Sequence, residues 1–102
     1  MRIVWTSSAD AGLEAIREYV ARDSEYYAAR YIARILEAVD ILDKHPEIGE
    51  VVFEVEDKKI RQLLFQSHRV FYHVQGDRVL VLAVIHAARD LDSLEPKPWD
   101  IS

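Results

Sequence analysis

The chain has 102 residues, half of them hydrophobic and 30% charged, which is typical of a folded globular domain and not of a disordered segment. The absence of cysteine excludes disulfide bonds and thiolate metal sites. The longest near-continuous apolar run, residues 79–85, is too short to cross a membrane, and the first turns of the chain hold no signal-peptide core. We therefore expect one soluble, cytoplasmic domain spanning residues 1–102, with no membrane partner.

The net charge of −5 conceals a strong separation of charge along the chain. Residues 58–89 hold six basic residues and a single acid, Asp77, so this stretch carries +5 and the rest of the chain carries −10. Such a distribution predicts a sheet with a basic face, opposite acidic helices, that docks on an anionic partner. The six basic residues are Lys58, Lys59, Arg61, Arg69, Arg78 and Arg89.

The first third of the chain is predicted to form a short strand and a helix. Residues 2–6 are rich in β-branched and aromatic side chains, which favours a strand, and Thr6, Ser7 or Ser8 can cap the helix that follows. Gly12 weakens this helix by about 1 kcal/mol relative to alanine, so we expect packing to hold it. The apolar stripe of the helix, with a 4-3-4 spacing, is Ala9, Leu13, Ile16 and Val20.

A second helix is predicted to begin after Ser24 and to end before Pro46, which disfavours helical dihedral angles at His45. The short link between the two helices implies an antiparallel hairpin that covers an apolar surface. Its stripe is Ala28, Ile32, Ile35, Val39 and Leu42, and Tyr26, Tyr27, Tyr31 and Ile41 add apolar surface beyond the stripe. These additional residues either form a partner-binding groove or cover an edge of the sheet.

The second half of the chain is predicted to form three antiparallel strands. Residues 60–65, 68–74 and 79–85 are the strands, joined by turns at residues 66–67 and 75–77. Residues 79–85 are apolar on both faces, which indicates a central strand. We expect residues 51–57 to be irregular or an edge segment and the tail, residues 92–102, to be loose.

The candidate site residues from the pattern alone are Arg61, Arg69, His86 and Arg89. In a hairpin turning at residues 76–77, the start of one strand and the end of the next lie side by side, which predicts a guanidinium cluster beside an imidazole. Guanidinium groups bind phosphates and carboxylates bidentately, and an imidazole adds general acid–base chemistry on RNA. The alternative is that these charges pair with Asp90, Asp92 or helix acids and only stabilise the sheet.

The four histidines, at positions 45, 68, 73 and 86, show no metal-ligand spacing, and no glycine-rich phosphate loop is present. We therefore predict no metal, no cofactor and no small-molecule substrate.

These pieces, in this order, resemble the ParE/RelE superfamily of toxins from bacterial type II toxin–antitoxin pairs. The resemblance covers residues 4–91. It rests on Val-Trp-Thr-Ser-Ser-Ala (4–9), Ile16 and Tyr19, residues 35–42, His-Pro-Glu-Ile-Gly (45–49), Ile-Arg-Gln-Leu (60–63), Arg-Val-Phe-Tyr (69–72), Asp-x-Val-x-Val-Leu (77–82) and His-Ala-Ala-Arg-Asp (86–90). It implies an α+β fold with an N-terminal strand, an antiparallel helical hairpin and a three-stranded antiparallel meander in one twisted sheet.

Within the superfamily, the chain is more similar to ParE, whose known members inhibit DNA gyrase, than to RelE, which cleaves mRNA on the ribosome. RelE-type nucleases carry lysines in the strand before the strand arginine, and often a tyrosine near the C-terminus. Arg69 fits the strand arginine and Arg89 the later basic residue, but the preceding strand offers only Arg61, and no tyrosine follows Arg89. His68 also stands where a tyrosine is common, and residues 66–67 replace a Gly-Pro turn.

The resemblance thus implies a plasmid-stabilisation type toxin that binds gyrase and is neutralised by a cognate antitoxin whose tail lies across the helices and the sheet. Arg61, Arg69, His86, Arg89, Tyr27 and Tyr31 are the predicted contacts with antitoxin or target. Two other functions stay open: a ribosome-dependent mRNA endoribonuclease using Arg61, Arg69, His86 and Arg89, and a non-toxic homologue that only forms the complex.

Overall fold

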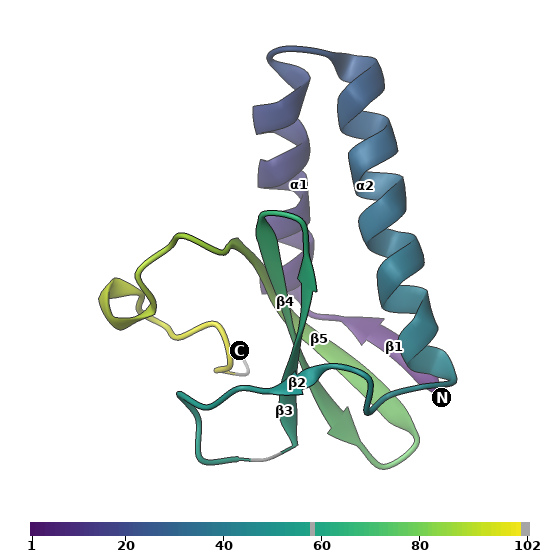
Figure 1. The fold of residues 1–102 in the computed structure, drawn as a ribbon, viewed down its shortest axis with the longest axis vertical. Helices are drawn as coiled ribbons and strands as arrows, with labels where there is room; N and C mark the ends of the chain where they lie inside the picture. Colours follow the sequence, from purple (N-terminus) through teal and green to yellow (C-terminus); the bar gives the residue numbers. More distant parts are fainter. Residues whose placement is uncertain (58, 101–102) are drawn as a thin grey trace.

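The computed structural model describes residues 1–57 and 59–100, and Figure 1 shows a helical hairpin standing on a curved sheet. No helix in these residues is long and apolar enough to cross a membrane. The elements are β1 (Arg2–Trp5), α1 (Ser7–Ala21), α2 (Glu25–Asp40), the 3₁₀ turn η1 (Ile41–Asp43), β2 (Glu50–Val51), β3 (Ile60–Phe65), β4 (His68–Gln75), β5 (Arg78–His86) and the 3₁₀ turn η2 (Leu91–Ser93).

The sheet has the strand order β1-β5-β4-β3-β2, so β5 is an interior strand between β1 and β4, as its two-sided apolar pattern predicts. β3, β4 and β5 form the predicted antiparallel meander, and β1 pairs with β5 in parallel. The predicted α+β fold, with its N-terminal strand, helical hairpin and meander in one sheet, is confirmed. In the segment expected to be irregular or an edge, residues 51–57, only Val51 lies in a strand, the short edge strand β2.

Two caps and one close approach explain the hairpin. Thr6 Oγ1 accepts a hydrogen bond from the Ala9 N–H at 3.1 Å, and Ser24 caps α2 in the same way through Tyr27 N–H. A Cβ atom added to Gly12 would lie 2.8 Å from the carbonyl oxygen of Val84. The glycine that weakens α1 therefore allows the helix to approach β5 closely, and packing compensates for its low helix propensity.

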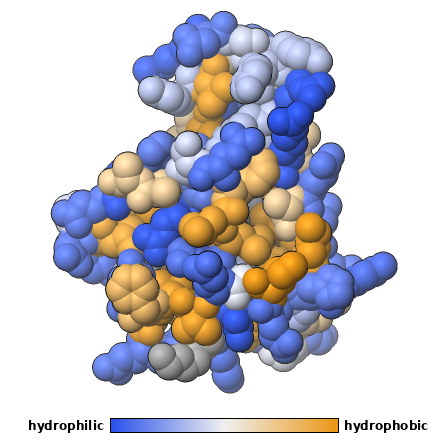
Figure 2. Space-filling model, viewed as in Figure 1, coloured by the Kyte–Doolittle hydropathy of each residue, from blue (hydrophilic) through white to orange (hydrophobic). Residues whose placement is uncertain are grey.

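The sheet divides the interior into two hydrophobic clusters, one on each face. The face toward the helices, called here the helix face, buries Tyr31, Ile35, Val70, Tyr72 and their neighbours. On the opposite face, called here the tail face, Val52, Phe71, Leu80 and Leu91 pack together. Figure 2 shows hydrophobic residues gathered over the sheet end of the molecule, while the far end of the hairpin is mostly hydrophilic.

A β-bulge in β5 decides which side chains share a face. The register between β4 and β5 shifts by one residue between Phe71 and Tyr72, whose partners are Ala83 and Val81. As a result, Leu82 and Ala83 both contribute to the tail-face cluster, while Val84 returns to the helix face. Beyond the bulge, His86 lies opposite His68, and both side chains lie on the helix face.

The tail was expected to be loose. Its described residues, 92–100, instead pack on the tail face of the sheet. Trp99 contacts Phe71 with the ring centroids 6.3 Å apart, and Leu91 and Leu94 join the same cluster. Lys97 Nζ donates hydrogen bonds to the carbonyl oxygens of Leu91 and Asp92. Apolar residues spaced along the tail therefore hold it down, although its prolines and charges suggest mobility. Residues 101–102 lie outside the described part of the chain.

Candidate functional site

The six predicted site residues separate into two groups in the structure. Tyr27, Tyr31, His86 and Arg89 line one groove between the hairpin and the end of the sheet. Arg61 and Arg69 lie elsewhere, each bound to oxygen atoms of its own chain. The predicted cluster of three arginines beside His86 is therefore not formed.

Arg69 belongs to the tail face and is largely enclosed. Its Nε donates to Gln62 Oε1 at 2.6 Å, and its Nη2 lies 3.4 Å from the carboxylate of Glu54. The guanidinium also lies over the Phe71 ring, 4.8 Å from the centroid, and the side chain is only 12% exposed. Arg69 thus connects the 52–57 segment to the sheet, so the ion pair forms with Glu54 and not with the acids considered from the sequence.

Arg61 supports a loop at the other end of β3. Its Nη1 donates to the carbonyl oxygens of Gly49, at 2.8 Å, and Glu47, at 3.3 Å. Tyr72 holds the same loop, because its hydroxyl donates to the carbonyl of Pro46 and accepts from the Gly49 N–H. Arg61 and Arg69 point to opposite faces of the sheet, so the expectation of one basic sheet face is wrong.

The groove that collects the other four residues has a volume of about 610 Å³. It lies where α1 and α2 extend past the turn between β3 and β4. Tyr19 and Tyr27 are 70% and 62% exposed, so the groove presents aromatic surface to solvent. It is lined by Gly12, Ala15, Ile16, Tyr19 and Val20 of α1, Tyr27 and Tyr31 of α2, Gln66, Ser67 and His68 at the β3–β4 turn, and Val84, Ile85, His86 and Arg89 at the end of β5.

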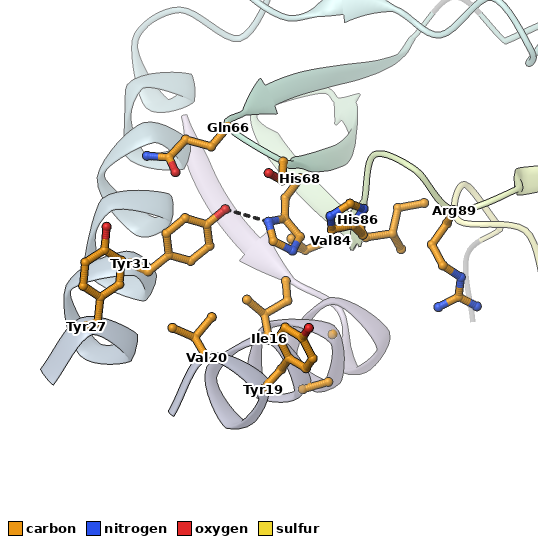
Figure 3. A pocket seen from close by; sticks show the side chains of 14 residues that line it. Ile16, Tyr19, Val20, Tyr27, Tyr31, Gln66, His68, Val84, His86 and Arg89 are labelled. Atoms are coloured by element: carbon orange, nitrogen blue, oxygen red, sulfur yellow. Dashed lines mark hydrogen bonds between the residues drawn. The ribbon is translucent and has the colours of Figure 1, made fainter. Parts of the chain in front are cut away.

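One edge of the groove is polar and the other is apolar. Figure 3 shows Tyr31, His68, His86 and Arg89 in a row, with Ile16 and the other α1 side chains facing them. The Tyr31 hydroxyl lies 2.6 Å from His68 Nδ1, and the His68 and His86 rings meet edge to face with centroids 5.3 Å apart. We call this row, Tyr31, His68, His86 and Arg89, the polar edge.

Two groups of the polar edge, Tyr31 and His68, favour their neutral forms. Burial raises the pKa of Tyr31, and a hydrogen bond from the Ser67 backbone partly opposes that effect. Burial also lowers the pKa of His68, and the neighbouring imidazole of His86 lowers it further. A neutral hydroxyl beside a neutral imidazole is therefore the resting state of this contact near pH 7.

Sequence reasoning did not select His68 or Tyr19 as site residues. His68 directly precedes the predicted site residue Arg69, but its position opposite His86 depends on the bulge in β5. Tyr19 follows Glu18 on the flank of the α1 stripe, which is a normal place for a partly covered aromatic residue. The signal that could have identified it is the recurrence of exposed tyrosines on both helices, at positions 19, 26 and 27.

The sequence is similar to those of bacterial toxins. The family model described as the ParE toxin of the type II toxin-antitoxin system parDE matches residues 3–91. Toxin RelE2 of Caulobacter vibrioides is 34% identical over 89 residues, which cover 86% of this chain and 97% of that protein.

Two solved structures have a similar fold. The chromosomal ParDE system from P. aeruginosa aligns with a TM-score of 0.71 and 25% identity, covering 84% of this chain and 95% of that one. The toxin–antitoxin complex RelBE2 from Mycobacterium tuberculosis aligns with a TM-score of 0.61 and 18% identity, covering 83% and 95%, and so shows likeness of fold alone.

Proposed function

The chain belongs to the ParE toxin family of type II toxin–antitoxin systems, and we propose that it arrests growth by binding DNA gyrase and is neutralised by a cognate antitoxin seated in the groove. Both partners would place its action in the cytoplasm. The observation that carries the proposal is the open groove of about 610 Å³ between the hairpin and the sheet.

The groove suits an amphipathic helix from the antitoxin. Ile16 and Val20 form an apolar wall, and the exposed rings of Tyr19 and Tyr27 stand on the two helices that bound it. Tyrosine is favoured at interfaces because its ring gives a large contact area while its hydroxyl stays solvated. Each Å² of apolar surface buried here would contribute roughly 25 cal/mol before the costs of ordering the partner are subtracted.

Separation of the arginines supports action by protein binding over RNA cleavage. A nuclease site needs several cationic groups around one phosphate, together with a proton donor or acceptor. Here Arg61 is bound to two backbone carbonyls and Arg69 to Gln62 and Glu54 on the opposite face. Neither guanidinium is positioned to join His86. Inhibition of gyrase by binding requires no such cluster.

Ribosome-dependent RNA cleavage is the second candidate, and one observation favours it. Two imidazoles, His68 and His86, lie in contact, and Arg89 lies at the end of the same groove. Such a pair can act as a general acid and a general base. In this case the groove would hold RNA instead of an antitoxin helix, and catalysis would depend on His68 and His86 and not on Arg69.

The test is controlled expression in a bacterial host. We expect growth arrest with induction of the DNA-damage response, and recovery when the antitoxin encoded beside the toxin gene is produced. Arrest with loss of mRNA and no DNA damage would move the chain to the nuclease candidate. Normal growth, with soluble protein verified at a high level, would mean a non-toxic homologue that only forms the complex.

A further inference from the structure

We infer that the polar edge of the groove is a binding site for one carboxylate, supplied by an Asp or Glu side chain on the antitoxin helix. This inference rests on the proposed docking of the antitoxin in the groove. It states which chemical group of the antitoxin the polar edge binds. It makes His68 and His86 hydrogen-bond donors to the partner, assisted by the charge of Arg89.

The hydrogen bonds of His86 determine its tautomer. The backbone N–H of Ala88 lies 3.0 Å from His86 Nδ1, and a backbone N–H can only donate. Nδ1 therefore uses its lone pair, and the proton of the neutral imidazole is on Nε2. A protonated Nε2 has no lone pair for a metal ion, but it offers one donor on the side of the ring away from Ala88.

His68 has the same tautomer for a different reason. The Tyr31 hydroxyl keeps its proton because burial raises its pKa, although a hydrogen bond from the Ser67 backbone partly opposes that rise. Its own proton therefore goes to His68 Nδ1, which lies 2.6 Å away. The remaining proton of His68 is on Nε2, which points away from Tyr31. Two adjacent rings thus each present an N–H and no acceptor.

The surroundings make this edge attractive to a negative group. The chain has 18 acidic residues, yet among the described residues that line the groove none is Asp or Glu. Arg89 is the only Lys or Arg among these lining residues, and it lies three residues after the end of β5. Charge-assisted hydrogen bonds from N–H groups to a carboxylate are shorter and stronger than neutral ones. The polar edge therefore matches one anion with two acceptor oxygens.

A protein carboxylate fits better than an RNA phosphate. Nucleic-acid binding takes several basic residues that each neutralise a phosphate, but this groove supplies one guanidinium in a chain whose net charge is −5. The opposite wall, with Ile16 and Val20, is apolar and would remain uncovered under a phosphate backbone. An amphipathic helix satisfies both edges, with apolar residues on α1 and one acid on the polar edge.

The experiment uses the full-length toxin and the antitoxin encoded beside its gene, with affinity measured by titration calorimetry. His86→Phe keeps a ring in the groove but removes the N–H donor, and we expect a dissociation constant at least 10-fold higher. The matched control, His45→Phe, changes an exposed histidine outside the groove and should leave the affinity unchanged. Nitrogen-15 NMR of the free toxin should show both His68 and His86 protonated at Nε2.

A double-mutant cycle identifies the partner group. Each Asp and Glu of the antitoxin is changed to its amide, and one of these changes should weaken binding to wild-type toxin but have no further effect on His86→Phe. Additive effects for every acid would overturn the inference, as would an Nδ1–H tautomer at His86. Binding of a 12-residue uridine oligonucleotide that is lost in His86→Phe, with antitoxin affinity unchanged, would also overturn it and assign the edge to RNA.

A further variant separates this inference from the proposed function. Tyr19→Ser removes an exposed ring from the apolar side and should weaken antitoxin binding in either case. If Tyr19→Ser weakens binding while the carboxylate cycle is additive, the carboxylate site is wrong and the docking stands. If Tyr19→Ser and His86→Phe both leave the affinity unchanged, the docking itself is wrong.

Discussion

Replacing Arg69 with methionine should destabilise the fold instead of removing a functional contact. The substitution keeps an unbranched side chain over Phe71 but deletes the guanidinium. It leaves the side-chain oxygen of Gln62, a residue only 7% exposed, without its 2.6 Å donor, and it releases Glu54. The 52–57 segment loses its Glu54 contact with β4 and keeps the contact between Asp57 and His73.

The magnitude follows from these contacts. A hydrogen bond from a charged donor is worth roughly 1.5–3 kcal/mol, and the partly exposed ion pair and the cation–π contact roughly 0.5–1 kcal/mol each. Ordering the arginine side chain costs up to about 2 kcal/mol of conformational entropy, and the substitution removes this cost, which offsets part of the loss. We expect a net loss of about 2 kcal/mol in the free energy of unfolding, which lowers Tm by roughly 8–16 °C in a domain of this size.

Thermal and guanidinium melts followed by circular dichroism measure this loss. The control is Arg34→Met on the exposed side of α2, for which we expect a change within about 0.5 kcal/mol. A variant with unchanged Tm and abolished toxicity would refute the reasoning, because Arg69 would then act as a contact or catalytic residue.

Three further predictions concern other contacts. Gly12→Ala should destabilise the protein by about 1–3 kcal/mol in thermal melts, although alanine is the better helix former, because its Cβ would lie 2.8 Å from the Val84 carbonyl oxygen; a rise in Tm would contradict this close approach. Tyr72→Phe removes two buried hydrogen bonds and should cost about 2 kcal/mol, whereas Tyr27→Phe on the surface should cost less than about 0.5 kcal/mol; equal effects would disprove the role of the Tyr72 hydroxyl. Folding lowers the pKa of His68, so unfolding takes up a proton when the pH lies between the folded pKa and about 6.5. The contribution of His68 to the free energy of unfolding should therefore be fully present above about pH 6.5 and should be lost as the pH falls to and through the lower folded pKa. Denaturant midpoints between pH 7.5 and 5.5 should therefore decline less in His68→Gln than in the wild type, and parallel declines would exclude His68 as the source.

The antiparallel meander and the helical hairpin could be predicted because their signals are local. Helix caps at Thr6 and Ser24, the apolar stripes and the two-sided pattern of β5 each depend on a few neighbouring residues. Gly12 shows which of its properties are local and which depend on a distant part of the chain. Its low helix propensity could be recognised from the sequence, but the carbonyl oxygen that it accommodates belongs to Val84, far along the chain.

The composition of the site could not be predicted, because it depends on one bulge. Regular alternation along β5 would have placed His86 on the tail face together with Arg69, which is part of the cluster that the sequence suggested. The extra residue near Leu82 turns His86 to the helix face, opposite His68. A β-bulge among uniformly apolar residues leaves no trace in a hydrophobic pattern. Because β5 is apolar on both faces, its pattern also does not indicate which face of the sheet the tail covers.

Incubation of the purified protein with gyrase and relaxed plasmid, beside a parallel incubation with ribosomes translating a defined mRNA, tests the central claim most directly. We expect supercoiling to be inhibited in proportion to toxin and restored by antitoxin, with the mRNA left intact. Uninhibited supercoiling together with mRNA cleavage at codon-defined positions, lost in His68→Gln or His86→Phe, would contradict the account.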